Sequence, residues 1–152
     1  MADTARRAAR DTSHGPGRLL VAAYAILAVG ATGRSGVQLA TKASEAPLAY
    51  SLSAVAAVVY IVATLALAKD WWRVALVACT TELVGVLTVG TLTVVDAADF
   101  PDATVWSLYG QGYLFLPLVL PVLGLLWLRR SREHRADTAD TADTSGSGAT
   151  RA

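Results

Sequence analysis

The stretch LAYSLSAVAAVVYIVATLALA, residues 48–68, contains no charged side chain and decides the fold class. A helix rises about 1.5 Å per residue, so this run is long enough to cross a hydrocarbon core of about 30 Å. Three further apolar runs, at residues 19–39, 74–95 and 108–128, contain at most one charged residue each. Their short connections favour antiparallel neighbours. We therefore expect an all-α membrane protein, a four-transmembrane-helix antiparallel bundle.

The composition of the 152-residue chain agrees with a membrane protein. It is 54% hydrophobic and only 16% charged, whereas soluble globular domains have about 25% charged residues. The single cysteine excludes an intramolecular disulfide. The sequence contains no recognisable catalytic motif, metal-ligand cluster or phosphate-binding loop. We therefore expect no enzymatic activity, no cofactor, no bound metal and no nucleic-acid partner.

Two polar tails flank the predicted transmembrane domain, which covers residues 19–129. Residues 1–18 are basic and contain Gly and Pro, and residues 130–152 end in a low-complexity tail in which Ala-Asp-Thr occurs three times. Such compositions cannot bury a core, so we expect both tails to be disordered. The alternative for the C-terminal tail is a phosphorylation or docking segment.

The distribution of basic residues predicts the orientation in the membrane. Ten Lys and Arg flank one set of helix ends, whereas the opposite side has only Arg34 and Lys42. The positive-inside rule therefore places both termini in the cytoplasm. Tryptophans fit aromatic belts at the two interfaces, with Trp106 at the outer one. The alternative, cleavage of the first apolar run as a signal peptide, leaves three helices in the same orientation.

Glu82 is the sharpest candidate for a functional residue. It lies about 12 Å into the third predicted helix, where a charge is costly and usually faces the bundle. Small residues share its face, and large aliphatic residues occupy the opposite face. Tyr60 lies at the same depth on the preceding helix, so we predict that its hydroxyl group donates a hydrogen bond to Glu82. A buried structural network, a proton or substrate site and a tolerated protonated acid remain open interpretations.

Arg34 and Gln38 are the polar candidates in the first helix. Arg34 lies about 10 Å from the depth of Glu82, toward the outer end. Its side chain either bridges to Glu82 or extends to the outer interface. In the fourth predicted helix, Pro117 and Pro121 predict a kink, which serves packing or acts as a hinge. The acidic loop between the last two helices, with Asp96, Asp99 and Asp102, is interpreted as solvated, and the alternative is cation binding by these carboxylates.

Four segments resemble a known group of proteins: ATGRSGVQLAT at 31–41, EAPLAY at 45–50, FPDATVWS at 100–107 and VLPVLGLLWLR at 119–129. They are similar to small four-helix integral membrane proteins of actinomycetes with no assigned function. The resemblance covers residues 19–129 and implies residence in the bacterial plasma membrane. It implies no activity and no site residues. Small multidrug transporters also have four helices, but their essential Glu lies in the first helix, where this chain has no carboxylate.

Two functions follow as expectations. The first is a non-enzymatic accessory or interaction protein of the bacterial plasma membrane, acting in the lipid bilayer as a homo-oligomer or with a membrane protein partner. The alternative is a small oligomeric transporter or channel that uses Glu82 as its proton or cation site.

Overall fold

A computed structural model describes residues 15–96 and 102–148 of the chain, with side chains as far as residue 133 except Pro16. Residues 1–14 of the predicted N-terminal tail and residues 97–101 of the acidic loop lie outside the described residues. Every regular element in the described part is helical. They are α2 (Pro16–Lys42), α3 (Pro47–Ala68), α4 (Trp72–Val95), the 3-10 segment η3 (Ser107–Tyr113) and α5 (Leu116–Gly148).

Three of these helices, α2, α3 and α4, are long and apolar enough to cross a membrane. A fourth crossing requires η3 and the apolar part of α5 together, and these two are bent by 98° relative to each other. The described residues therefore form an all-helical structure that is compatible with a membrane bundle.

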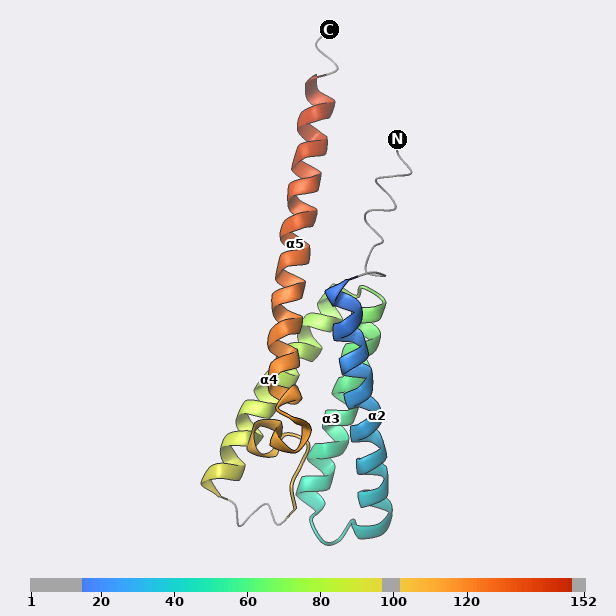
Figure 1. The fold of residues 1–152 in the computed structure, drawn as a ribbon, viewed down its shortest axis with the longest axis vertical. Helices are drawn as coiled ribbons and strands as arrows, with labels where there is room; N and C mark the ends of the chain where they lie inside the picture. Colours follow the sequence, from blue (N-terminus) through green and yellow to red (C-terminus); the bar gives the residue numbers. More distant parts are fainter. Residues whose placement is uncertain (1–14, 97–101, 149–152) are drawn as a thin grey trace.

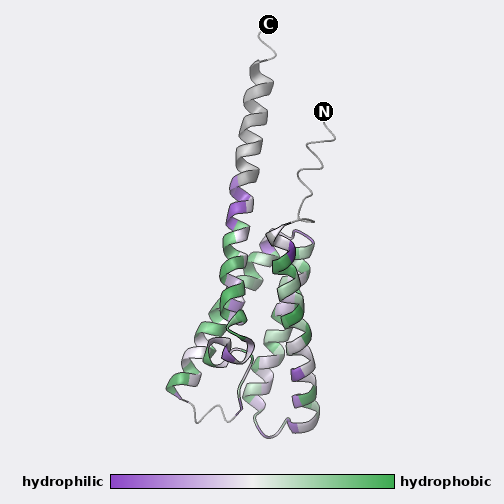
Figure 2. Ribbon diagram, in the orientation of Figure 1, coloured by the Kyte–Doolittle hydropathy of each residue, from purple (hydrophilic) through white to green (hydrophobic). Residues whose placement is uncertain are grey.

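Consecutive helices run in opposite directions (Figure 1). α2 packs along α3, and α4 packs against both α3 and α5, whereas α2 and α5 make few contacts. η3 lies against α4 in the half of the bundle that is far from the polar part of α5 (Figure 1). The helices are mostly hydrophobic over the bundle, and α5 turns hydrophilic where it leaves the other helices (Figure 2).

The connection between α3 and α4 is short because α3 ends in a Schellman motif. Asp70 takes the left-handed conformation, with φ of 57°. The amide of Trp71 donates to the carbonyl of Ala66 at 2.8 Å, and the amide of Asp70 donates to the carbonyl of Leu67 at 3.4 Å. These two bonds satisfy carbonyl groups at the helix end and turn the chain back into α4.

Small side chains line the helix interfaces. On α3 and α4 the buried positions include Ala56, Ala63, Ala75 and Ala78. Small residues let helix backbones approach closely, which is how membrane helices pack without a hydrophobic driving force. The inward face predicted for α4 from its helical wheel is confirmed, because Val77 and Val84 on the opposite face are exposed while Ala75 and Ala78 are buried.

The prediction of one continuous helix over residues 108–128 is wrong in its first half. Leu108, Tyr109 and Gly110 all have left-handed backbone angles, and α5 begins only at Leu116. Pro117 thus lies in the first turn of α5, where its missing amide is not needed, and it does not kink a longer helix. A Cβ atom at Gly110 would lie 2.6 Å from the Pro117 ring, so the tight turn requires glycine there.

Residues 103–108, which we call the irregular segment, enter the bundle as non-helical chain that runs into the start of η3, and side chains of neighbouring helices satisfy their backbone. The amide of Val105 donates to Ser53 Oγ on α3 at 3.4 Å, and the amide of Leu108 donates to Thr93 Oγ1 on α4 at 2.9 Å. Non-helical backbone is tolerated at membrane depth where protein groups replace water in this way or where it lines a water-filled cavity. The segment is therefore an integral part of the bundle.

Helix α5 continues to Gly148, whereas the sequence pattern predicts that the fourth helix ends at residue 128 and that a disordered tail begins at residue 130. Ala, Arg and Glu in this stretch are strong helix formers. A helix that is already nucleated gains one backbone hydrogen bond for each residue it adds, which favours its continuation past residue 128.

Candidate functional site

Five side chains from α2, α3, α4 and the irregular segment meet in the middle of the bundle, and we call them the polar centre. They are Tyr24, Tyr60, Cys79, Glu82 and Trp106, and none of them is more than 4% exposed. Cys79 and Glu82 lie one helical turn apart on the small-residue face of α4. Tyr24 of α2 contacts both of them, and Tyr60 of α3 lies beside Tyr24.

Glu82 is fully buried, and its two carboxylate oxygens have different environments. The Tyr24 hydroxyl group donates a hydrogen bond of 2.7 Å to Oε2. Oε1 is also buried and has no hydrogen-bond partner among the described residues. An unsatisfied oxygen in a membrane interior is costly, so its presence needs a structural or functional explanation.

The predicted hydrogen bond from Tyr60 to Glu82 is replaced by one from Tyr24. The hydroxyl group of Tyr60 instead accepts a hydrogen bond of 3.0 Å from the indole nitrogen of Trp106. Tyr60 is nevertheless fully buried, and its ring centroid lies 6.5 Å from that of Tyr24. Tyr60 thus lies in the region predicted from its depth, but the depth of a residue does not determine which hydroxyl group points at the carboxylate.

Sequence reasoning did not single out Tyr24. A signal was present, because Tyr24 is a hydroxyl-bearing residue in the first apolar run, in the half of the helix that lies toward Glu82 in depth. Its hydroxyl group also lies 3.5 Å from Cys79 Sγ. A Cβ atom at Gly124 of α5 would be 2.9 Å from the same sulfur, so a glycine on α5 leaves room for this contact.

Trp106 was expected in the outer aromatic belt, and the structure corrects this. Its ring packs against Gly85, where an added Cβ atom would come within 2.7 Å of the ring. Gly85 is only about 4.5 Å further along α4 than Glu82. Ser53 and Thr93 hold the irregular segment inside the bundle. Trp106 therefore lies at mid-depth rather than at the interface.

Arg34 and Gln38 lie apart from the polar centre. Arg34 Nη2 donates a hydrogen bond of 2.7 Å to the carbonyl oxygen of Ala103, and its Nε donates to Gln38 Oε1 at 3.4 Å. The Arg34 side chain therefore does not bridge to Glu82 but extends away from it, which is the second predicted alternative. The carbonyl group of Ala103 lies within its reach there.

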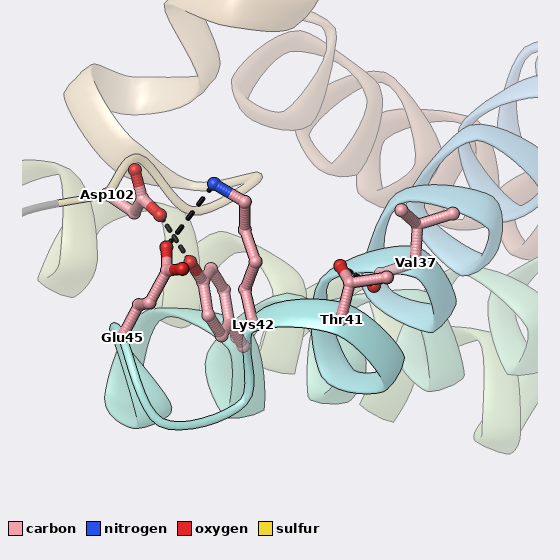
Figure 3. A network of polar contacts seen from close by, with 6 residues as sticks. Val37, Thr41, Lys42, Glu45 and Asp102 are labelled. Atoms are coloured by element: carbon pink, nitrogen blue, oxygen red, sulfur yellow. Dashed lines mark hydrogen bonds and ion pairs between the residues drawn. The ribbon is translucent and has the colours of Figure 1, made fainter.

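A second connection fastens the same segment at this end of the bundle. Asp102 accepts a hydrogen bond from the Tyr50 hydroxyl group, beside the ion pair of Lys42 and Glu45 at 3.3 Å (Figure 3). Within α2, the Thr41 hydroxyl group donates a hydrogen bond of 2.7 Å to the carbonyl group of Val37, four residues earlier (Figure 3). Asp102 and Ala103 are thus tied to α3 and α2 immediately before the chain enters the bundle.

In chemical terms, the polar centre offers one carboxyl group, two phenol groups, a thiol group and an indole donor. Within residues 15–96 and 102–148, no three His, Cys, Asp or Glu side chains are close enough to hold a metal ion. The chain matches no protein-family model, no curated protein and no solved structure. The geometry of the polar centre is therefore the basis for assigning a role to Glu82.

Proposed function

We propose that the chain is a multi-pass protein of the bacterial plasma membrane with four spans and with both ends in the cytoplasm. In this arrangement η3 and the apolar part of α5 form the last span. The ten-to-two distribution of basic residues supports the orientation. The start of α2 and the short hydrophilic stretch of α5 next to the bundle lie at the same end, which agrees with this orientation (Figure 2). The resemblance to actinomycete membrane proteins supports the location.

Cysteine labelling in intact cells tests this topology. The one native cysteine, Cys79, is buried and should give little background. Ser44→Cys lies at an exposed position in the α2–α3 connection and should react with a membrane-impermeant maleimide from outside. Lys69→Cys lies in the α3–α4 connection and should react only after the membrane is permeabilised. The reverse pattern would place the termini outside.

We further propose that the protein acts non-enzymatically, as an accessory protein that binds another membrane protein. The observation that supports this role is the enclosure of the polar centre. Glu82, Tyr24 and Tyr60 are fully buried, and the indole of Trp106, itself buried, donates a hydrogen bond to Tyr60. Side chains that bond to one another inside the chain stabilise a fixed arrangement of helices, which is what a docking partner requires.

Isolation of the tagged protein from its native membrane in a mild detergent tests the accessory role. We expect a stoichiometric membrane protein partner, whose abundance falls when the gene is deleted and recovers when the wild-type chain is restored. Recovery of the chain only as a monomer or homo-oligomer, with no dependent protein, would contradict the proposal.

The unpartnered Oε1 of Glu82 supports a second candidate, in which the chain is a small oligomeric transporter that loads a proton at this oxygen. Ionisable residues inside membrane bundles often mark proton pathways. Tyr24 then holds Oε2 while Oε1 takes up and releases the proton. The bend between η3 and α5 is the part of the fold that resembles the discontinuous helices of transporters.

Proton flux into vesicles containing the purified protein distinguishes the two candidates. A transporter should acidify the vesicle lumen under an imposed potential, and Glu82→Gln should abolish the flux while the variant remains folded. Thr80→Ser, a conservative change at an exposed position of α4, is the matched control and should retain full flux. Absence of flux from the wild-type protein would leave the accessory role as the explanation of the buried network.

A further inference from the structure

A groove of about 530 Å³ lies between α2 and α5, where these two helices make few contacts. Its walls are aliphatic, and half of their side chains are substantially exposed. They are Leu19, Leu20, Ala23, Leu120, Leu123 and Leu126. A groove of this kind is open toward the hydrocarbon of a bilayer and presents no polar wall group along most of its length.

The polar end of the groove is formed by Trp127 and Arg130. Here α5 passes from hydrophobic to hydrophilic (Figure 2), so this end marks the level of the membrane interface. Tryptophan at this level is typical of headgroup contacts. Arg130 is exposed and carries a guanidinium group that can bind a phosphate with two parallel hydrogen bonds.

A second groove of about 420 Å³ adjoins the first and is lined by Gly17, Arg18 and the end of α3. Trp127 lines both grooves. A Cβ atom at Gly17 would lie 3.1 Å from the Trp127 ring, so the ring is packed against the start of α2. The indole therefore forms a fixed wall between the aliphatic groove and a second basic side chain.

We propose that the groove between α2 and α5 binds one anionic phospholipid, with its phosphate at Arg130 and an acyl chain along Leu120, Leu123 and Leu126. Aliphatic walls that end in tryptophan and arginine match a ligand with a hydrocarbon tail and a negative head. Basic pockets between membrane helices are known to bind such headgroups. Charge complementarity at Arg130 favours this ligand over an apolar helix of a second copy, which would leave the guanidinium group without a counter-charge. The site is independent of whether the protein is an accessory protein or a transporter.

Native mass spectrometry of the full-length protein, titrated with phosphatidylglycerol or phosphatidylcholine, tests the site. We expect one retained phosphatidylglycerol and much weaker retention of phosphatidylcholine. Arg130→Gln should weaken phosphatidylglycerol binding by about tenfold or more, because a charge-assisted hydrogen bond is lost. Arg129→Gln is the matched control, since this neighbouring exposed arginine lines neither groove, and it should bind like the wild type.

A groove-filling variant provides a second measurement. Ala23→Phe should block the acyl-chain position and reduce lipid retention, whereas Ala40→Phe, at an exposed position of the same helix outside both grooves, should not. Equal losses for Arg129→Gln and Arg130→Gln would indicate only general attraction of anionic lipid to a basic end and would overturn the proposal. Equal retention of the two lipids, or full binding by Ala23→Phe, would overturn it as well. Displacement of the lipid by a peptide of the α5 apolar segment would assign the groove to a second copy instead.

Discussion

The Tyr24 hydroxyl group on α2 donates a hydrogen bond of 2.7 Å to Glu82 on α4, across 58 positions of the chain. This bond joins the first and third helices, which are not consecutive. Among the described residues, Glu82 is the only Asp, Glu, Lys or Arg whose side chain is completely buried.

Removal of the Tyr24 hydroxyl group should destabilise the bundle. In Tyr24→Phe, the Glu82 carboxyl group loses its only described donor, and we expect a loss of about 1–2 kcal/mol in the free energy of unfolding. Tyr109→Phe is the control, because it removes an exposed hydroxyl group that lies 3.2 Å from Thr91. Thermal unfolding in detergent measures both, and equal midpoints for the two variants would show that the bond to Glu82 contributes nothing.

Substitutions of Glu82 should separate hydrogen bonding from charge. Glu82→Gln keeps a side-chain oxygen that can accept from Tyr24, so we expect stability close to that of the wild type. Glu82→Leu leaves the buried Tyr24 hydroxyl group without this acceptor and should lose about 1–3 kcal/mol. Chemical denaturation in mixed micelles compares the two variants. A leucine variant as stable as the glutamine variant would rule out a structural role for the bond.

Gly85 and Gly33 form a matched pair for the packing of Trp106. A Cβ atom at Gly85 would come within 2.7 Å of the Trp106 ring, whereas one at Gly33 would meet nothing within 4 Å. Gly85→Ala should therefore cost about 1–3 kcal/mol through overpacking and alter the tryptophan fluorescence. Gly33→Ala should be neutral or slightly stabilising. Unchanged fluorescence and stability in Gly85→Ala would indicate that Trp106 is not packed against α4.

The bond between Tyr50 and Asp102 should control how firmly the irregular segment is held. Asp102→Asn and Tyr50→Phe should each speed amide exchange in residues 103–108, because this bond fastens the segment to α3. Glu45→Gln, which breaks a solvent-exposed ion pair with Lys42, should leave exchange there unchanged. Hydrogen–deuterium exchange followed by mass spectrometry reports all three. Similar exchange in every variant would show that the bond between Tyr50 and Asp102 does not hold the segment.

The candidate site was predictable in part. The depth of Glu82 and the small residues on its face were sufficient to predict that it lies inside the bundle, since a charged side chain in an apolar run has few stable alternatives. Tyr60 was located in the right region by the same counting of helical rise. Whether Tyr24 or Tyr60 donates to Glu82 was not predictable, because the rotation of each helix about its axis depends on packing and is not encoded in depth.

The sequence by itself determined that the chain is helical and that three runs are long and apolar enough to cross a membrane. Those properties depend on local composition, because backbone groups in hydrocarbon must bond within their own helix. Only the tertiary structure decided that the fourth apolar run breaks into η3 and α5 and that Trp106 lies beside Gly85. These features require Ser53 and Thr93, on other helices, to satisfy backbone groups of the irregular segment. Bonds between residues this distant depend on how whole helices pack, which no local pattern of residues specifies.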